Sequence, residues 1–132
     1  MTSVFLDTVG LLASWDSTDQ WHEVALRALD ALGPDVRTVT TSYVMLECGN
    51  AAARRRYRPL ADQMRTKLEN GGKLIHPTVQ EWEEAWAAYE KGIAGDAGIV
   101  DQVSFVVMRR LGITDCFTND RHFRAAGFNT LF

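Results

Sequence analysis

Four carboxylates in this chain stand beside apolar segments instead of among other surface charges: Asp7, Glu47, Asp101 and Asp120. Taking an unpaired carboxylate out of water is costly, so each of them needs a partner or a purpose. Gathered without cations, the four groups would also repel one another and resist ionisation. A hard divalent cation resolves both problems, and ligands that are all oxygen atoms suit Mg²⁺ or Mn²⁺. The residue types therefore predict a site for these ions, provided that the fold brings the four together.

Each acid also has a purely structural interpretation. Asp101 and Asp120 lie at the starts of predicted helices, where free N–H groups and the helix dipole favour a carboxylate. Glu47, taken alone, is an ordinary residue on a helix surface. Asp7 is the hardest to explain in this way, because it ends the apolar run at 4–6. The joint arrangement is thus more specific than any one of its members.

The elements that must position these residues alternate along the chain. The predicted strands occupy residues 4–6, 36–41, 73–77, 113–118 and the stretch near 129–132. Amphipathic helices fill the intervals, with Thr18 or Asp19 as one expected N-cap and Thr78 with Glu81 as a capping box. This alternation predicts an α/β fold of one domain, residues 1–132, with a central, mainly parallel sheet of four to five strands flanked by helices.

The predicted positions of the acids in this fold agree with a shared site. Asp7 ends the first strand and Asp120 follows the fourth, while Glu47 lies in the second turn of the helix after the second strand. Asp101 lies in the first turn of the helix that follows the Gly-rich joint at 92–98. Ligands of such sheets bind beyond the carboxyl ends of the strands. We therefore expect the acids to gather at that edge.

Composition narrows the class of protein. The apolar runs are shorter than the roughly 18 residues that a membrane span requires, and no secretion signal is visible. Cys48 and Cys116 lie far apart without metal-ligand spacing, so we expect two free thiols and a reducing cytoplasm. The formal net charge of −3, taken alone, argues against binding to nucleic acid.

The distribution of charge answers that objection. Four arginines surround Tyr57 just past the helix that carries Glu47, and arginines with an interleaved aromatic suit a phosphate backbone and an unstacked base. Arg121, beside Asp120, is a further candidate for a phosphate contact. The alternative is a solvated helix end, where the dipole favours cations. The predicted RNA contacts are Arg54, Arg55, Arg56, Arg58 and Arg121.

Four segments of the chain resemble the PIN-domain ribonucleases, and more narrowly the VapC-type toxins of toxin–antitoxin pairs. They are "VFLDT", "TSYVMLECGNAAARR", "VDQVSF" and "FTNDRHFRAAGF", in the family's order over nearly the whole chain. The resemblance implies a Mg²⁺- or Mn²⁺-dependent endoribonuclease that hydrolyses RNA phosphodiester bonds. It also implies a cognate antitoxin that binds the toxin, and a homodimer. By the same resemblance, Thr118 matches the threonine of a T-x-D element, and the metal-binding and catalytic acids are Asp7, Glu47, Asp101 and Asp120.

The chain departs from the family pattern around these acids. Val9, Gly98 and Val100 stand where many relatives carry polar residues, which affects the surroundings of the metal but not the four ligands. Asp96 in the Gly-rich joint is either a substitute ligand or, more in keeping with its surroundings, an exposed loop residue. His122 follows Asp120 closely enough to reach a substrate, but widely spaced histidines more often cap, pack or face solvent.

Two other functions compete with the nuclease. One is a PIN-like scaffold that binds RNA or protein with weak or no catalysis, which the changes near the metal site favour and the four retained acids oppose. The other is a receiver-like switch phosphorylated on aspartate. That switch needs a lysine on a late strand, and no lysine follows Lys91. Trp82, Trp86 and Tyr89 share one helix face, which is expected in the core first and in a partner surface second.

Overall fold

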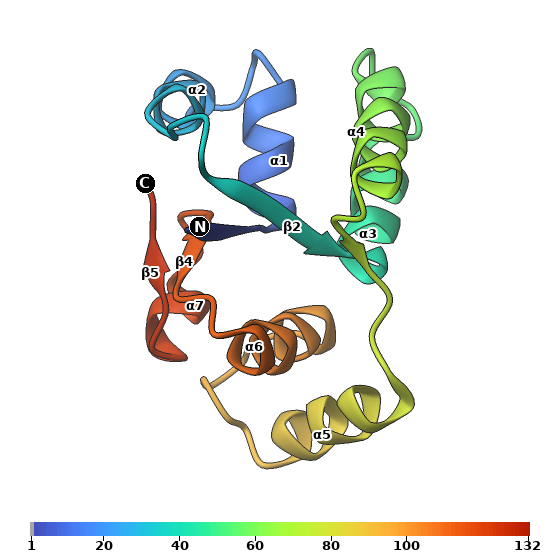
Figure 1. The fold of residues 1–132 in the computed structure, drawn as a ribbon, viewed down its shortest axis with the longest axis vertical. Helices are drawn as coiled ribbons and strands as arrows, with labels where there is room; N and C mark the ends of the chain where they lie inside the picture. Colours follow the sequence, from blue (N-terminus) through green and yellow to red (C-terminus); the bar gives the residue numbers. More distant parts are fainter. Residues whose placement is uncertain (1) are drawn as a thin grey trace.

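Five parallel strands form one sheet in the order β3-β2-β1-β4-β5 (Figure 1). The structure is a computed structural model, and it describes residues 2–132. Val4 at the centre of the sheet pairs with Thr38 on one side and Asp115 on the other. The predicted α/β fold with a parallel sheet is confirmed. The strands are β1 (Ser3–Leu6), β2 (Arg37–Thr41), β3 (Leu74–Ile75), β4 (Asp115–Phe117) and β5 (Asn129–Thr130).

Seven helices in the described chain cover the two faces of this sheet. The chain first moves outward from β1 to β3 and then returns to β4, so right-handed crossovers put the two sets of helices on opposite faces. Figure 1 shows α1, α2 and α4 on one side of β2, and α5 and α6 on the other. The helices are α1 (Thr8–Trp15), α2 (His22–Asp30), α3 (Ser42–Ala52), α4 (Arg58–Asn70), α5 (Val79–Glu90), α6 (Ile99–Leu111) and α7 (Arg121–Ala125).

The helix starts agree only partly with the predicted caps. The capping box of Thr78 and Glu81 at the start of α5 is confirmed. The expected cap of α2 at Thr18 or Asp19 is wrong, because α2 begins at His22 after Trp21. The Asp19 carboxylate instead accepts the backbone N–H of Trp21 at 2.8 Å. This side-chain-to-backbone bond forms a local turn in place of a cap.

The core lies between the sheet and its helices. Phe5, Phe105 and Phe123 are completely buried, and the two free cysteines are buried as well. Gly10 in α1 packs so closely against β4 that a Cβ at this position would collide with the carbonyl oxygen of Phe117. This close approach fixes the start of α1, and with it Asp7, against the end of β4.

The aromatic face of α5 lies outside this core. Trp82, Trp86 and Tyr89 remain 44%, 40% and 49% exposed, so the expectation of core positions is wrong for them. They contact each other edge to face, and Trp82 also contacts Tyr43 of α3 in this way. Of the helices formed by residues 2–132, none combines the length and apolar character needed to cross a membrane.

Candidate metal centre

Three of the predicted acids meet at the carboxyl ends of the two central strands. Asp7 caps α1 directly after β1, and Asp120 caps α7 just after β4. These strands are neighbours, with Leu6 opposite Phe117. Asp101 joins them from the first turn of α6. The charges of Asp101 and Asp120 both act to raise the pKa of Asp7, as expected for carboxylates that face one another.

Asp7 is the buried member of this acidic cluster. It is 1% exposed, and its Oδ2 accepts the Thr118 hydroxyl at 2.8 Å and the Val9 N–H at 3.3 Å. Burial raises its pKa from the ordinary 3.8 to about 7, although the bond from Thr118 opposes the shift. Without a cation, the carboxyl is therefore partly protonated near neutral pH. The predicted position of Thr118 beside this acid agrees with the structure.

Asp101 carries the second strongly raised pKa. Burial is the main cause, the charges of Asp120 and Glu47 add to it, and together they raise its pKa to about 6. Neither Asp7 nor Asp101 forms an ion pair with lysine or arginine within residues 2–132. A buried acid and a half-buried acid that repel each other without a counter-charge make a set of oxygen donors that fits a hard divalent cation.

Asp120 is held by His122, a residue that the sequence predicted would cap, pack or face solvent. Its Oδ1 accepts the backbone N–H of His122 at 2.9 Å and lies 2.8 Å from the Nδ1 of the same residue. The Nε2 of His122 lies 2.6 Å from Oδ1 of Asp96, and this bond is the largest cause of a raised His122 pKa. Asp101, Asp120 and His122 offer ligand atoms that all lie within 4.8 Å of one another.

Glu47 stands at the rim of the cluster. Its exposed side chain accepts the Thr8 hydroxyl at 2.6 Å, which joins the first turn of α1 to α3. Its charge contributes to the raised pKa of Asp101, so it faces the cluster from the α3 side. The four predicted acids thus come from four separate helices or helix caps around one edge of the sheet.

Asp96, Gly98 and Val9 are the residues near the acids for which the sequence predicted a departure from the family pattern or a choice between two roles. Asp96 is exposed, with a side chain 76% accessible, yet it reaches the cluster through His122 and also lies 3.5 Å from Arg121. Gly98 caps α6 without any side-chain bond, and Val9 is 37% exposed. The sequence signal for His122 was present, because it stands two residues after an acid that caps a helix.

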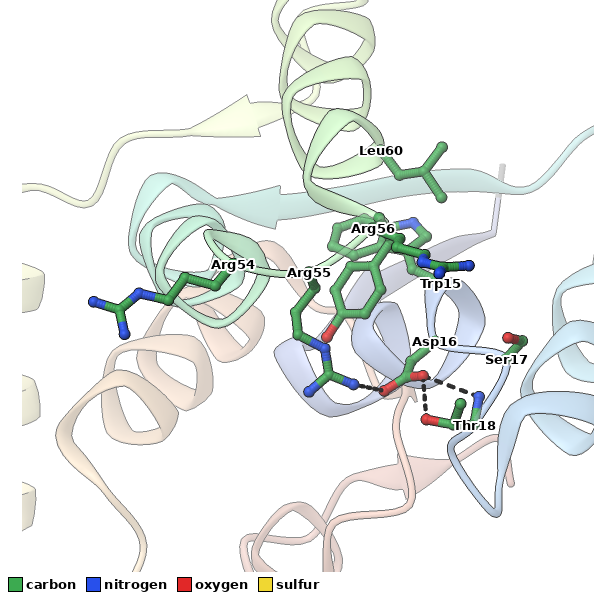
Figure 2. A pocket seen from close by; sticks show the side chains of 9 residues that line it. Trp15, Asp16, Ser17, Thr18, Arg54, Arg55, Arg56 and Leu60 are labelled. Atoms are coloured by element: carbon green, nitrogen blue, oxygen red, sulfur yellow. Dashed lines mark hydrogen bonds and ion pairs between the residues drawn. The ribbon is translucent and has the colours of Figure 1, made fainter.

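The predicted RNA-binding arginines lie in different places. Arg121 lies next to the cluster, but Arg54, Arg55 and Arg56 lie at the far end of α1, and Arg58 lies between α3 and α4. Arg55 pairs with Asp16 at 3.0 Å, and Arg58 donates to the carbonyl of Ala53 at 3.2 Å. A pocket of about 560 Å³ opens beside Arg54, Arg55 and Arg56 (Figure 2). These arginines are therefore not part of the acidic cluster.

Comparison with known proteins identifies the family. A PIN domain family model matches residues 4–129. The chain belongs to the PIN domain family. Over 126 residues it is 29% identical to VapC20 of Mycobacterium tuberculosis, which is described as a 23S rRNA-specific endonuclease, with 95% of each chain covered. The predicted resemblance to VapC-type toxins is thereby confirmed.

Solved structures agree with this assignment of the PIN domain. The crystal structure of VapC20, described as a toxin that cleaves the sarcin–ricin loop, superimposes with a TM-score of 0.79 at 28% identity over 95% of both chains. FitAB bound to a DNA fragment gives a TM-score of 0.68 at 18% identity, covering 96% of this chain and 92% of that one. FitAcB from Neisseria gonorrhoeae gives 0.64 at 15% identity, covering 96% and 95%. The last two show a shared fold.

Proposed function

We propose that this PIN domain is a Mg²⁺- or Mn²⁺-dependent endoribonuclease and the toxin of a type II toxin–antitoxin pair. The observation that carries the proposal is the meeting of Asp7, Asp101 and Asp120, with Glu47 beside them, in a chain that belongs to this family. Asp7 is buried and Asp101 half-buried, and because their pKa values are raised toward neutrality, these two carboxyls are poorly placed for packing alone. They are well placed to hold a divalent cation.

The proposed roles follow from the contacts. Asp7, Asp101 and Asp120 would hold one or two ions, and Glu47 would serve as a further ligand or orient the attacking water. A bound ion lowers the pKa of its water and stabilises the charge that builds on the phosphate. Thr118 keeps the Asp7 carboxylate in one orientation through its 2.8 Å bond. Asp96 would act indirectly, because it forms a hydrogen bond with His122, which in turn holds Asp120.

The proposed substrate is RNA, and 23S rRNA is the first to test because VapC20 is described as specific for it. The partner is an antitoxin protein whose binding inhibits the enzyme. A homodimer and a cytoplasmic location complete the proposal. Each follows from the VapC-like relationship.

The decisive experiment is cleavage of end-labelled RNA by the purified protein. It compares 23S rRNA with other cellular RNAs, with Mg²⁺, Mn²⁺ or EDTA, and includes Asp7→Asn. Asp62→Asn serves as the control, since this exposed α4 acid lies in a surface ion pair with Arg65. Cleavage should need the metal, vanish in Asp7→Asn and persist in Asp62→Asn.

A binding scaffold with little catalysis is the alternative function. Val9, Gly98 and Val100 favour it, because they stand where many relatives carry polar residues. The scaffold interpretation would be adopted if the folded wild type bound RNA or a partner and, with either metal, cut no better than Asp7→Asn.

A further inference from the structure

A pocket separate from the acidic cluster lies at the other end of α1 from Asp7. Its walls come from the end of α1, the turn that follows, the segment after α3 and the start of α4 (Figure 2). A volume of about 560 Å³ lies in the usual range of small-ligand sites, roughly 300–1,000 Å³. The lining residues are Trp15, Asp16, Ser17, Thr18, Arg54, Arg55, Arg56, Tyr57 and Leu60.

Excess positive charge lines this pocket. Figure 2 shows Arg55 directed toward Asp16 and Arg54 directed away from it. The Asp16 carboxylate binds Arg55 at 3.0 Å and also accepts the hydroxyl of Thr18 at 2.6 Å. Arg54 and Arg56 have no ion-pair partner in residues 2–132. The lining thus has three arginines and one carboxylate, and the unpaired Arg56 leaves a positive charge for an anionic ligand beside the Asp16–Arg55 pair.

Aromatic rings form the other part of the wall. The Trp15 and Tyr57 ring centroids lie 6.3 Å apart with an angle of 39° between the planes. The guanidinium of Arg55 lies 5.6 Å from the centroid of the Tyr57 ring. Because Asp16 fixes that guanidinium, Arg55 loses little conformational freedom when a ligand binds. Cations beside a half-buried aromatic pair suit a nucleotide, which has a phosphate and a flat base.

The pocket and the acidic cluster lie along the same pair of helices. The bond from Thr8 to Glu47 joins α1 to α3 near the acids, and the Asp16–Arg55 pair joins the end of α1 to the turn after α3. The eight residues of α1 separate the two places by about 12 Å, at 1.5 Å per residue. A short stretch of single-stranded RNA covers this distance.

We propose that this pocket binds one unpaired nucleotide of the RNA substrate at a fixed distance from the bond that is cut. The base stacks against Trp15 and Tyr57, and its phosphate contacts Arg55 and Arg56. The pocket is then a specificity site for the nuclease. This inference rests on the proposed function, because it assumes that RNA is the substrate. An acidic peptide is the less favoured ligand, since it would use the arginines but leave the aromatic pair unused.

The test measures RNA binding without cleavage and then cleavage itself. Fluorescence anisotropy in EDTA gives the affinity for labelled single-stranded RNA of about 4 and about 12 nucleotides, a span that covers common site sizes. The variants are Tyr57→Leu, Tyr57→Phe and Arg56→Ala. Arg27→Ala, an exposed arginine of α2 outside the pocket, removes the same charge as a control. Steady-state kinetics with Mg²⁺ or Mn²⁺ follow for the same proteins.

The expected results separate stacking from charge. Tyr57→Leu should weaken binding of the longer RNA about tenfold. Tyr57→Phe should bind this RNA as tightly as the wild type does, because the aromatic ring supplies the stacking. Arg56→Ala should reduce the slope of log affinity against log salt by about 0.7, the value for one phosphate contact on a single strand. In cleavage, both changes should raise KM and leave kcat nearly unchanged.

Two outcomes would overturn the pocket proposal while the nuclease stands. One is cleavage and RNA affinity in Tyr57→Leu and Arg56→Ala equal to those of Arg27→Ala. The other is an Arg56→Ala variant that binds RNA as the wild type does but no longer binds an acidic peptide that the wild type binds. If the wild type binds RNA through this pocket in EDTA but cuts nothing with either metal, the proposed catalysis fails, and the pocket is an RNA-binding site without a role in specificity of cleavage.

Discussion

The hydroxyl of Thr118 donates a hydrogen bond to Oδ2 of Asp7 over 2.8 Å, between residues 111 positions apart in the sequence. The same hydroxyl oxygen accepts the backbone N–H of Asp120 at 3.1 Å. Thr118 is completely buried and follows β4, whereas Asp7 follows β1. A single side chain thus links the two strand ends and orients both acids.

Replacing Thr118 by valine should weaken metal binding more than it weakens the fold. Val keeps the volume, but Asp7 loses its donor and the Asp120 N–H loses its acceptor. Changes to residues that support metal ligands cost about 10–100-fold in affinity, so we expect a loss in that range for Mn²⁺, measured by calorimetry. Ser104→Ala is the control, because it removes another buried hydroxyl, which bonds to Val100 instead. Equal Mn²⁺ affinity in both variants would contradict the role given to Thr118.

The raised pKa of Asp7 makes the stability of the metal-free protein depend on pH. The pKa rises from 3.8 in its ordinary state to about 7 in the fold, so between these values the folded chain keeps a proton that the unfolded chain has lost. The free energy of unfolding should therefore fall as the pH rises from about 4 to about 7. Asp101, with a pKa of about 6, acts in the same direction.

Urea unfolding in EDTA at pH 5 and pH 7.5 checks this dependence. Asp7→Asn should be more stable than the wild type at pH 7.5, by a few kcal/mol, and should lose much of the pH dependence. Asn still accepts the Thr118 hydroxyl and still caps α1. Asp62→Asn, on the surface, should follow the wild type. If the free energy of unfolding changed with pH equally in the wild type and in Asp7→Asn, the Asp7 carboxyl would not be the source of the pH dependence.

His122 should affect the metal through Asp120. His122→Asn removes the ring that lies 2.8 Å from Asp120 and 2.6 Å from Asp96, so Asp120 keeps only the backbone N–H of residue 122 on its Oδ1. We expect Mn²⁺ affinity to fall about tenfold. Asp96→Asn should have a smaller effect, because the side chain is exposed and acts through the histidine. His76→Asn, an exposed histidine elsewhere, is the control and should bind Mn²⁺ as the wild type does.

The sequence was sufficient for the parts of the molecule that depend on local patterns. β-Branched runs and helix periodicity predicted the parallel sheet. The acids predicted at strand ends and helix starts lie around one edge of it, although the ligand atoms within 4.8 Å of one another belong to Asp101, Asp120 and His122. Contacts between distant segments were harder to foresee. Nothing near Asp16 in sequence indicates that it pairs with Arg55, 39 positions away, so neither RNA contact nor a solvated helix end, the two predicted alternatives, includes this ion pair. Likewise, the helical spacing of Trp82 and Trp86 resembles that of core residues, although no element of the described chain covers them fully.

Gly10 shows how closely the site depends on packing that its own residues do not reveal. Ala at this position would drive its Cβ into the backbone carbonyl of Phe117, which cannot rotate away as a side chain could. We expect Gly10→Ala to destabilise the protein by about 1–3 kcal/mol or more and to displace Asp7 from Thr118. Gly49 in α3 has no atom near its added Cβ, so Gly49→Ala should stabilise by about 0.5–1 kcal/mol through helix propensity. Thermal unfolding of the two variants, with Mn²⁺ binding as the second measurement, distinguishes the collision at Gly10 from a general effect of alanine. If both glycines tolerated alanine equally well, the close contact between α1 and β4 would not be what holds Asp7 in place.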